Sequence, residues 1–306
     1  MRLGVLDVGS NTVHLQVVDA RRGVAPVPTH STKYPLHLIE DALDDGSLSV
    51  LGEKRLIEAV AAASAVAEEH AVDDMLAFAT SAVREAPNGD AVLAAVRLRT
   101  GVDLQVLTGE DEARLTFLAV RRWHGFGAGR IAMLDIGGGS LEIAAGDHEE
   151  PDLVTSLPLG AGRLTRTHVV HDPPTRSELD RLRQAVDAVL DEVRRDHGWN
   201  RAPDVAVATS KTFRSLWRLA GSREKNGVRT LTRPDVAEVL RRVSGMSVAE
   251  REQLPGVTAT RAPQLVAGAV VAEGTMRGLG IDAVVLCPWA LREGILLRRL
   301  DWLAGV

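Results

Sequence analysis

The amino-acid sequence predicts an α/β fold made of two similar halves, and two observations support this prediction. Short apolar runs that suit buried strands alternate with longer segments of helical periodicity, which favours layers with helices on both faces of a sheet. A strand, a glycine turn and a second strand begin near Leu3 and again near Ile131. With 306 residues, the chain is long enough for two domains, each with its own core.

An internal duplication supports the two halves. The segments DVGSNTVHL and DIGGGSLEI share an acid, a glycine turn and an alternating strand, at an offset of 128 positions. Downstream, FATSA and VATSK place Thr80 and Thr209 129 positions apart. Two matches at nearly one offset indicate a structural unit that is present twice. The aligned pairs are Asp7 with Asp135, Gly9 with Gly137, Thr12 with Ser140 and His14 with Glu142.

Each element of the first half is expected from its periodicity and its end signals. Strands alternate apolar and polar residues, whereas helices repeat apolar residues every three or four positions. Glycine and capping residues mark the ends, as in the capping box at 108–111. On these signals we expect strands at 3–8, 12–17, 24–32, 74–79 and 104–107, a surface loop at 34–49, and helices around 56–67, at 88–100 and from 108 to about 123.

The second half follows the same order after a glycine-rich segment at 124–129, which we expect to be the hinge between the halves. A capping box at 175–178 opens a long helix, and the stretch 221–233 is expected to be a mobile loop. We expect strands at 131–136, 141–143, 153–157, 205–208 and 283–287, and helices after 160, at 179–193, 234–243, 248–253 and 263–277, and from Pro288 onward.

Composition limits the partners of this protein. A formal net charge of −5 argues against a nucleic-acid polymer, so a polyanionic ligand must be met by a local cluster of Arg and Lys together with metal. The sequence has no apolar run of membrane-spanning length and no secretory signal pattern. The one cysteine, Cys287, is expected only to pack, and it fits a reducing compartment. We therefore expect a cytoplasmic protein without a membrane partner.

The strongest chemical signal is the glycine turn of the second half. Three glycines at 137–139 are expected to adopt φ values that other residues avoid, and to expose amides that can hold phosphate oxygens. Asp135 precedes this turn, and Ser140 and Glu142 follow it. Two carboxylates beside a phosphate site are physically sensible if a divalent cation lies between them. An ordinary tight hairpin is the alternative explanation of the glycines.

Further candidates are ambiguous from the sequence. Glu110, Asp111 and Glu112 offset the helix dipole in a first helical turn, and one of them could instead be a catalytic base. His14 is expected to be a satisfied polar residue on a half-buried strand. Several basic residues follow turns or open helices, where they could bind phosphate, although a surface role is more common for each alone. They are Arg84, Arg114, Arg163, Lys211, Arg214, Arg261 and Arg292.

Seven segments together resemble the exopolyphosphatase / guanosine pentaphosphate phosphohydrolase (Ppx/GppA) family. The resemblance implies two ribonuclease-H-like domains of the actin/Hsp70/sugar-kinase superfamily around a central cleft, here residues 1–124 with 290–306, and residues 125–289. It also implies the short form, which lacks the added C-terminal HD-like region. The segments run in matching order from Leu3 to Leu297: DVGSNTVHL, FATSAVREAPN, LTGEDEARLTFLAV, LDIGGGSLEI, LPLGAGRLT, RAPQLVAGAVVAE and CPWALREGIL.

The resemblance also implies roles for the candidates. Glu112 matches the catalytic glutamate that activates the water, and Asp135 and Glu142 match the catalytic acids that hold Mg²⁺, with Asp7 as a further metal ligand. ATSKTF replaces the more glycine-rich turn common at this loop, which leaves the role of Lys211 open, and a lysine there could meet a longer phosphate chain. The phosphate-binding residues that the resemblance implies are Gly9, Ser10, Asn11, Thr12, Arg84, Gly137, Gly138, Gly139, Ser140 and Lys211.

The implied reaction is in-line attack of water on a terminal phosphoryl group, without a covalent intermediate. The implied activity is that of an exopolyphosphatase, which releases orthophosphate from inorganic polyphosphate. Hydrolysis of the 5′ γ-phosphate of pppGpp is the close alternative, since both substrates end in a phosphoanhydride. A binding or sensor protein without turnover and an ATP-dependent kinase are alternatives of other classes. A homodimer is expected from the resemblance.

Overall fold

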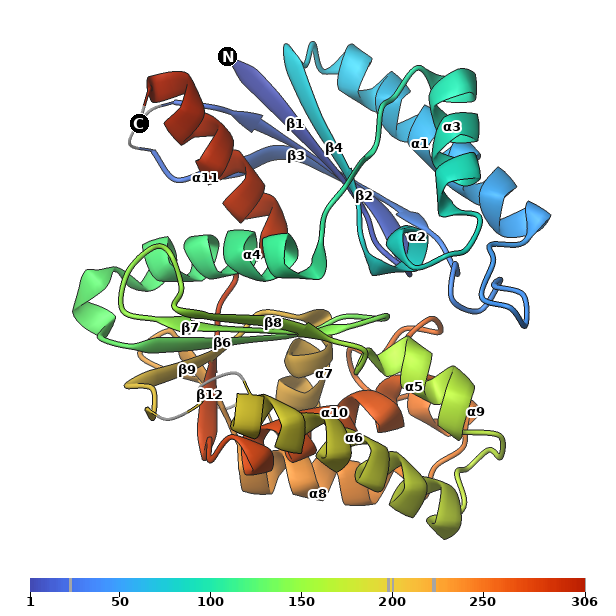
Figure 1. Cartoon of the computed structure of the whole chain (residues 1–306), viewed down its shortest axis with the longest axis vertical. Coiled ribbons are helices and arrows are strands. Elements are labelled where there is room, and N and C mark those ends of the chain that lie inside the picture. Colours follow the sequence, from blue (N-terminus) through green and yellow to red (C-terminus); the bar gives the residue numbers. More distant parts are fainter. Residues whose placement is uncertain (22–23, 197–198, 200, 222–223, 306) are drawn as a thin grey trace. The chain divides into compact units, whose positions relative to one another are not determined.

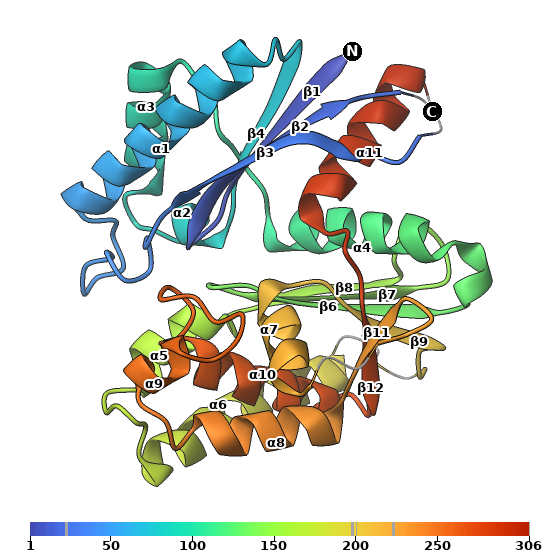
Figure 2. The same cartoon turned by 180° about the vertical axis from the view of Figure 1, so that it is seen from behind.

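The computed structural model describes residues 1–21, 24–196, 199, 201–221 and 224–305. It divides into two compact units (Figures 1 and 2). Unit 1 contains Met1–Ala119 and Leu291–Val306, and unit 2 contains Val120–Ala290. The division falls inside one helix, α4 (Gly109–His124).

Unit 1 is a five-stranded mixed sheet in the order β3-β2-β1-β4-β5, with helices on both faces. The strands β1 to β3 are antiparallel, whereas β4 and β5 run parallel to β1. Leu6 and Leu15 face α1 and α3, and Leu3 and Val5 face α11 (Figures 1 and 2). The bounds are β1 (Arg2–Val8), β2 (Thr12–Asp19), β3 (Pro28–Pro35), α1 (Val50–Glu69), β4 (Asp74–Ala79), α2 (Ser81–Arg84), α3 (Gly89–Thr100), β5 (Gln105–Val106) and α11 (Leu291–Ala304).

Unit 2 is a seven-stranded mixed sheet in the order β10-β11-β12-β9-β6-β7-β8. One large core joins Leu134 and Ile143 of the sheet to α5, α6, α8 and α10, which gather on one side of it (Figure 2). The bounds are η1 (Phe126–Ala128), β6 (Ile131–Ile136), β7 (Leu141–Gly146), β8 (Leu153–Leu157), α5 (Ala161–His168), α6 (Arg176–Asp196), β9 (Val205–Ala208), α7 (Lys211–Leu219), β10 (Glu224–Lys225), β11 (Val228–Thr232), α8 (Arg233–Val243), α9 (Val248–Glu252), α10 (Leu265–Gly278) and β12 (Ala283–Leu286).

The two sheets repeat one plan, and the predicted α/β fold of two ribonuclease-H-like units is confirmed. In each unit a three-stranded antiparallel meander is followed by two strands parallel to its first strand: β1-β2-β3 with β4 and β5, and β6-β7-β8 with β9 and β12. Asp7 pairs with His14 in the first hairpin, and Asp135 pairs with Glu142 at the equivalent positions of the second. The predicted duplication is thus present in the strand register.

Three predicted elements were wrong. The stretch 221–233 contains the hairpin β10–β11, although Ser222 and Arg223 lie outside the described residues. In β11 only Leu231 is buried, so the strand lacks the apolar alternation that would reveal it. The last helix begins at Leu291 and not at Pro288. The third strand covers Pro28–Pro35, so it lies later than predicted and takes the first two residues of the predicted loop.

The lengths and compositions of the described helices bear on whether any of them could cross a lipid bilayer. A spanning helix needs a long apolar stretch with few charges. Within the described part of the chain, none of the helices combines that length with that apolarity.

Candidate functional site

The acids of the second hairpin lie side by side on one face of the unit 2 sheet. Asp135 is opposite Glu142, and Glu142 is opposite Ser156 on the next strand. Directly opposed residues share a face, with Cβ atoms about 5 Å apart. The Oγ of Ser156 donates to Oε1 of Glu142 at 2.9 Å, and the Oγ1 of Thr209 donates to Oδ2 of Asp135 at 2.5 Å. Each carboxylate is therefore held by a hydroxyl from a neighbouring strand.

This carboxylate pair suits a hard divalent cation. Glu142 is buried, and two like charges directly opposite each other destabilise a sheet unless they are neutralised. Mg²⁺ is typically held by one or two carboxylates and completes its shell with water and substrate oxygens. Among the residues that the structure describes, His, Cys, Asp and Glu form no group of three or more that could hold a metal. The donor set of Asp135 and Glu142 thus fits Mg²⁺ but not a metal held entirely by protein.

The glycine turn that follows β6, residues 137–140 and called here the second turn, is braced by the start of α5. The amides of Ala161 and Arg163 donate to the carbonyls of Gly137 and Gly138 at 3.0 and 2.9 Å, and Nε of Arg163 donates to the carbonyl of Gly139 at 2.7 Å. These bonds occupy the carbonyls of the turn. In the described chain, the amides of Gly138 and Gly139 have no acceptor, so they remain available to an anion.

The reason for the glycines differs from the prediction. None of the glycines at 137–139 has a positive φ. The close approach is instead at Gly160, where an added Cβ would lie 2.1 Å from the carbonyl carbon of Gly139 and 2.4 Å from the amide nitrogen of Ser140. The backbones of the second turn and of Gly160 pack directly on each other, and side chains at this place would force them apart.

Basic side chains of unit 2 lie at and beside the first turn of α7. Lys211 is exposed in the first turn of α7, whose N-terminus is capped by Ser210. Nη1 of Arg261 lies 3.4 Å from Oγ1 of Thr212, one residue further along that helix. Burial lowers the pKa of Arg261 to about 10, a change that Asp135 opposes and Arg214 reinforces. Arg261 stays protonated at neutral pH and supplies positive charge near Asp135.

In unit 1, the turn between β1 and β2, residues 9–12 and called here the first turn, has the same backbone bond as the second. The amide of Gly9 donates to the carbonyl of Thr12 at 3.0 Å, and the amide of Gly137 donates to the carbonyl of Ser140 at 2.9 Å. The segment after β3 braces the first turn, because the amides at 36 and 38 donate to the carbonyls of Asn11 and Ser10. Asp7, which precedes this turn, forms an ion pair with Arg292 at 2.8 Å.

The three neighbouring acids of α4 have separate roles. The amide of Asp111 donates to the Oγ1 of Thr108, whose hydroxyl donates to Oδ2 of Asp111, and Glu110 lies 3.4 Å from Arg114 on the exposed face. Glu112 is 8% exposed and accepts from Nη1 of Arg84, which also donates to the carbonyl of Leu107 at 2.7 Å. The local structure thus singles out Glu112 as the buried acid, and it places Arg84 directly on that carboxylate.

His14 and Cys287 have the structural environments that were expected for them, a satisfied polar residue and a packed cysteine. Nε2 of His14 lies 2.8 Å from the Oγ of Ser31 on the neighbouring strand β3, and the ring is buried. Cys287 is buried after β12.

The sequence missed the roles of Arg163, Arg261 and Arg292, which it named only among seven basic residues. The only sequence signals for these three arginines were their positions after LPLGAG, before APQL and within ALREG, in that order.

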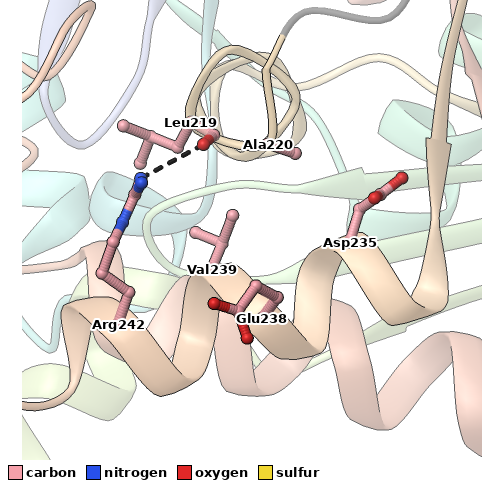
Figure 3. Close-up of a pocket in the computed structure, with 6 residues that line it drawn as sticks. All are labelled: Leu219, Ala220, Asp235, Glu238, Val239 and Arg242. Carbon is pink, nitrogen blue, oxygen red and sulfur yellow. Dashed lines mark hydrogen bonds between the residues drawn. The ribbon is translucent and has the colours of Figure 1, made fainter.

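Unit 2 also has a pocket between α7 and α8 (Figure 3). Its six labelled residues include none of the predicted site residues. Figure 3 shows Arg242 reaching across to the carbonyl of Leu219, with a hydrogen bond of 3.1 Å. Glu238 is bound to Arg241 through both oxygens. The charged groups of this pocket therefore have partners within the protein.

Known proteins resemble this chain over nearly its whole length. It is 53% identical over 305 residues to exopolyphosphatase 1 of Mycobacterium tuberculosis, covering 98% of this chain and 89% of the relative. It is 26% identical to a guanosine-5′-triphosphate,3′-diphosphate pyrophosphatase of Aeromonas hydrophila, covering 96% of this chain and 58% of the relative. The crystal structure of an exopolyphosphatase from Cytophaga hutchinsonii superimposes with a TM-score of 0.87 at 25% identity, covering 99% and 98% of the two chains. The model of the Ppx/GppA phosphatase family matches residues 17–302, and the chain therefore belongs to that family.

Proposed function

We propose that this protein is an exopolyphosphatase that hydrolyses the terminal phosphoanhydride of inorganic polyphosphate and releases orthophosphate. The observation that carries the proposal is the 53% identity to exopolyphosphatase 1 over nearly the full chain. The second turn supports it, since free amides, a carboxylate pair and nearby basic side chains suit a metal-bound phosphate.

The proposed roles follow from the local contacts. Asp135 and Glu142 would hold Mg²⁺, which when bound supplies charge stabilisation to the phosphoryl oxygens. The amides of Gly138 and Gly139 would donate to the terminal phosphate, and Ser140 and Lys211 would add side-chain donors. The first turn would add donors from Ser10, Asn11 and Thr12, whereas the amide of Gly9 already donates to the carbonyl of Thr12 and would shape the turn around the phosphate.

Glu112 is the proposed general base. Its buried carboxylate is held by Arg84, so it can accept a proton from a water molecule in a fixed direction as that water attacks phosphorus. Arg84 was expected to bind phosphate, and its contact with Glu112 gives it a second proposed role, which is to fix the direction of this base.

Hydrolysis of pppGpp is the second candidate, supported by the Aeromonas hydrophila relative at 26% identity. Steady-state rates on short polyphosphate and on pppGpp, each with and without Mg²⁺, test the choice. We expect kcat/KM to be at least about tenfold higher for polyphosphate, which corresponds to about 1.4 kcal/mol of transition-state stabilisation. A tenfold preference for pppGpp would reverse the assignment. Unchanged polyphosphate and pppGpp after long incubation with Mg²⁺ would support a sensor without turnover.

The remaining expectations are part of the same proposal. We infer a homodimer in the cytoplasm, with domain limits at 1–124 with 290–306 and at 125–289. Light scattering of the purified protein measures the mass in solution against the 32.8 kDa of one chain. A mass equal to one chain would contradict the dimer.

A further inference from the structure

The segment between α8 and α10, residues 244–264, is held together by one buried side chain (Figure 2). The side chain of Arg251 in α9 is 2% exposed. Its Nε donates to the carbonyl of Met246 at 3.1 Å, and its Nη1 donates to the carbonyls of Ala262 and Pro263 at 2.8 and 3.4 Å. No residue of this described segment is in a strand, so its buried carbonyls need donors of another kind. The guanidinium supplies them and joins the two ends of the segment.

Asp172 compensates the charge of this guanidinium. Its Oδ1 accepts from Nη2 of Arg251 at 2.9 Å, and both of its oxygens accept from the amide of Val248, the first residue of α9. Burial lowers the pKa of Arg251, and Asp172 opposes that change. Because removal of one partner leaves the other charge buried and unpaired, such a pair holds its geometry strongly. Asp172 thus fixes both the guanidinium and the start of α9.

Asp172 lies in a turn that the start of α6 holds. Oε1 of the buried Glu178 accepts from the amides of Val170 and His171 at 2.8 and 3.2 Å. Oε2 accepts from the amide of Thr175 at 2.7 Å. These bonds fix the backbone on both sides of Asp172, so its carboxylate meets the guanidinium from an ordered turn.

The carbonyls that the guanidinium holds come directly after Arg261. The amide of Arg261 donates to the carbonyl of Thr258 at 2.8 Å, which closes the turn that carries this residue. Nη1 of Arg261 donates to Oγ1 of Thr212 at 3.4 Å, and that hydroxyl donates to the carbonyl of Ile136, just before the second turn, at 3.0 Å. The backbone that Arg251 fixes therefore directs Arg261 toward the second turn.

We propose that Arg251 and Asp172 are a positioning pair that sets the direction of Arg261 and thereby the affinity of the second turn for the phosphates of the substrate. The pair acts through Arg261 and does not itself contact the substrate. A long cationic side chain that is ordered before binding loses less conformational entropy when phosphate arrives. The inference rests on the proposed hydrolase function, in which basic side chains near the second turn meet the phosphate.

Kinetics of two matched variants test the pair. Asp172→Ala removes the carboxylate that accepts from Arg251. Asp187→Ala is the control, since Asp187 forms an ion pair of 2.8 Å with Arg277 in the same unit, and the side chains of the two aspartates are 44% and 42% exposed. We expect kcat/KM for polyphosphate to fall about tenfold in Asp172→Ala and to stay within about twofold of the wild type in Asp187→Ala. Equal values in the two variants would overturn the inference.

A double variant separates positioning from a general loss of stability, with every assay run below the thermal unfolding transition of the variants. In the Arg261→Gln background, Asp172→Ala should lower kcat/KM by less than about twofold, because the side chain that the pair directs is already absent. Losses that multiply would show that the pair acts independently of Arg261 and would overturn the inference. Asp172→Asn keeps an oxygen that can accept from Arg251 and should recover part of the loss. A loss as large as that of Asp172→Ala would contradict the positioning role.

Binding of methylenediphosphonate, a non-hydrolysable analogue of two linked phosphates, tests the pair without turnover. In the presence of Mg²⁺, calorimetry should give a Kd at least about fivefold higher for Asp172→Ala than for the wild type, and within about twofold for Asp187→Ala. An unchanged Kd in Asp172→Ala would overturn the inference, as would a wild-type protein that does not bind the analogue. A wild type that hydrolyses neither polyphosphate nor pppGpp, with binding that still depends on Asp172, would instead reject the proposed function and support the positioning pair.

Discussion

The first and second hairpins share a backbone plan but differ in the partners of their acids. In both, a glycine amide closes the turn onto the carbonyl three residues later. Asp7 is neutralised by Arg292, whereas Asp135 is paired across the sheet with Glu142 and hydrogen bonded by Thr209. One copy of the duplicated unit thus supplies an acid that is bound to an arginine, and the other supplies two acids that face each other across the sheet. Two copies of one backbone plan can therefore have different chemical roles, which are set by a few side chains.

The largest expected effect concerns the buried acid of α4. Glu112→Gln should lower kcat on polyphosphate by about 10²- to 10⁴-fold, because it removes the group proposed to accept the proton of the attacking water. KM should change much less, since the loss falls on the transition state. Steady-state kinetics at saturating Mg²⁺ measure both parameters. A variant with wild-type kcat would remove Glu112 from the mechanism.

The next effect concerns the metal requirement and bears directly on the two hairpins. Asp135→Asn and Glu142→Gln should each raise the Mg²⁺ concentration needed for half-maximal activity at least tenfold, because each removes one of two carboxylates that face each other. Titration of activity with Mg²⁺ measures the shift. Treatment with a chelator should abolish wild-type activity, and readdition of Mg²⁺ should restore it. Activity that survives chelation would contradict a catalytic metal.

A smaller effect is expected from alanine substitutions that test how closely the backbone packs at each of the two turns. Gly160→Ala should lower kcat/KM about a hundredfold, because its methyl group would displace the second turn, and a shift of about 1 Å in a positioning group has effects of that order. Gly9→Ala is the matched comparison in the first turn, where the nearest heavy atom would lie 3.6 Å from the added carbon, an ordinary contact distance. We expect less than a tenfold loss there. Equal losses in both variants would contradict the difference in bracing.

The smallest effect is expected outside both turns. Glu238→Gln converts a carboxylate to an amide on α8, as Glu142→Gln does on β7, but Glu238 is bound to Arg241 on the exposed surface. Exposed ion pairs typically contribute about 0–1 kcal/mol, so stability and kcat/KM should stay close to the wild type. Thermal unfolding and the polyphosphate assay measure both. A large kinetic loss would show that the amide substitutions act through general electrostatics.

Much of the fold could be predicted from local signals. Asp74–Ala79 and Leu153–Leu157 were predicted at their observed limits, since each is a short strand bounded by polar residues. The hairpin β10–β11 could not be predicted, because it joins the edge of the sheet through backbone pairing and buries few side chains. Asp7, Asp135 and Glu142 were found because they flank glycine turns, whereas Glu112 was one of three ambiguous acids in a helical turn until the resemblance singled it out. The need for glycine at position 160 could be seen only in the structure, where the backbone of the second turn packs directly against it.

The sequence by itself determined the duplicated α/β plan, the two turns and the set of acids, because periodicity and turn residues act over short distances along the chain. Only the tertiary structure decided which acid has which partner. Asp7 and Arg292 are 285 positions apart, and Arg84 and Glu112 are 28 apart. Such pairs form where separate helices and strands pack together, and charge compensation depends on distance in space and not on spacing in the chain.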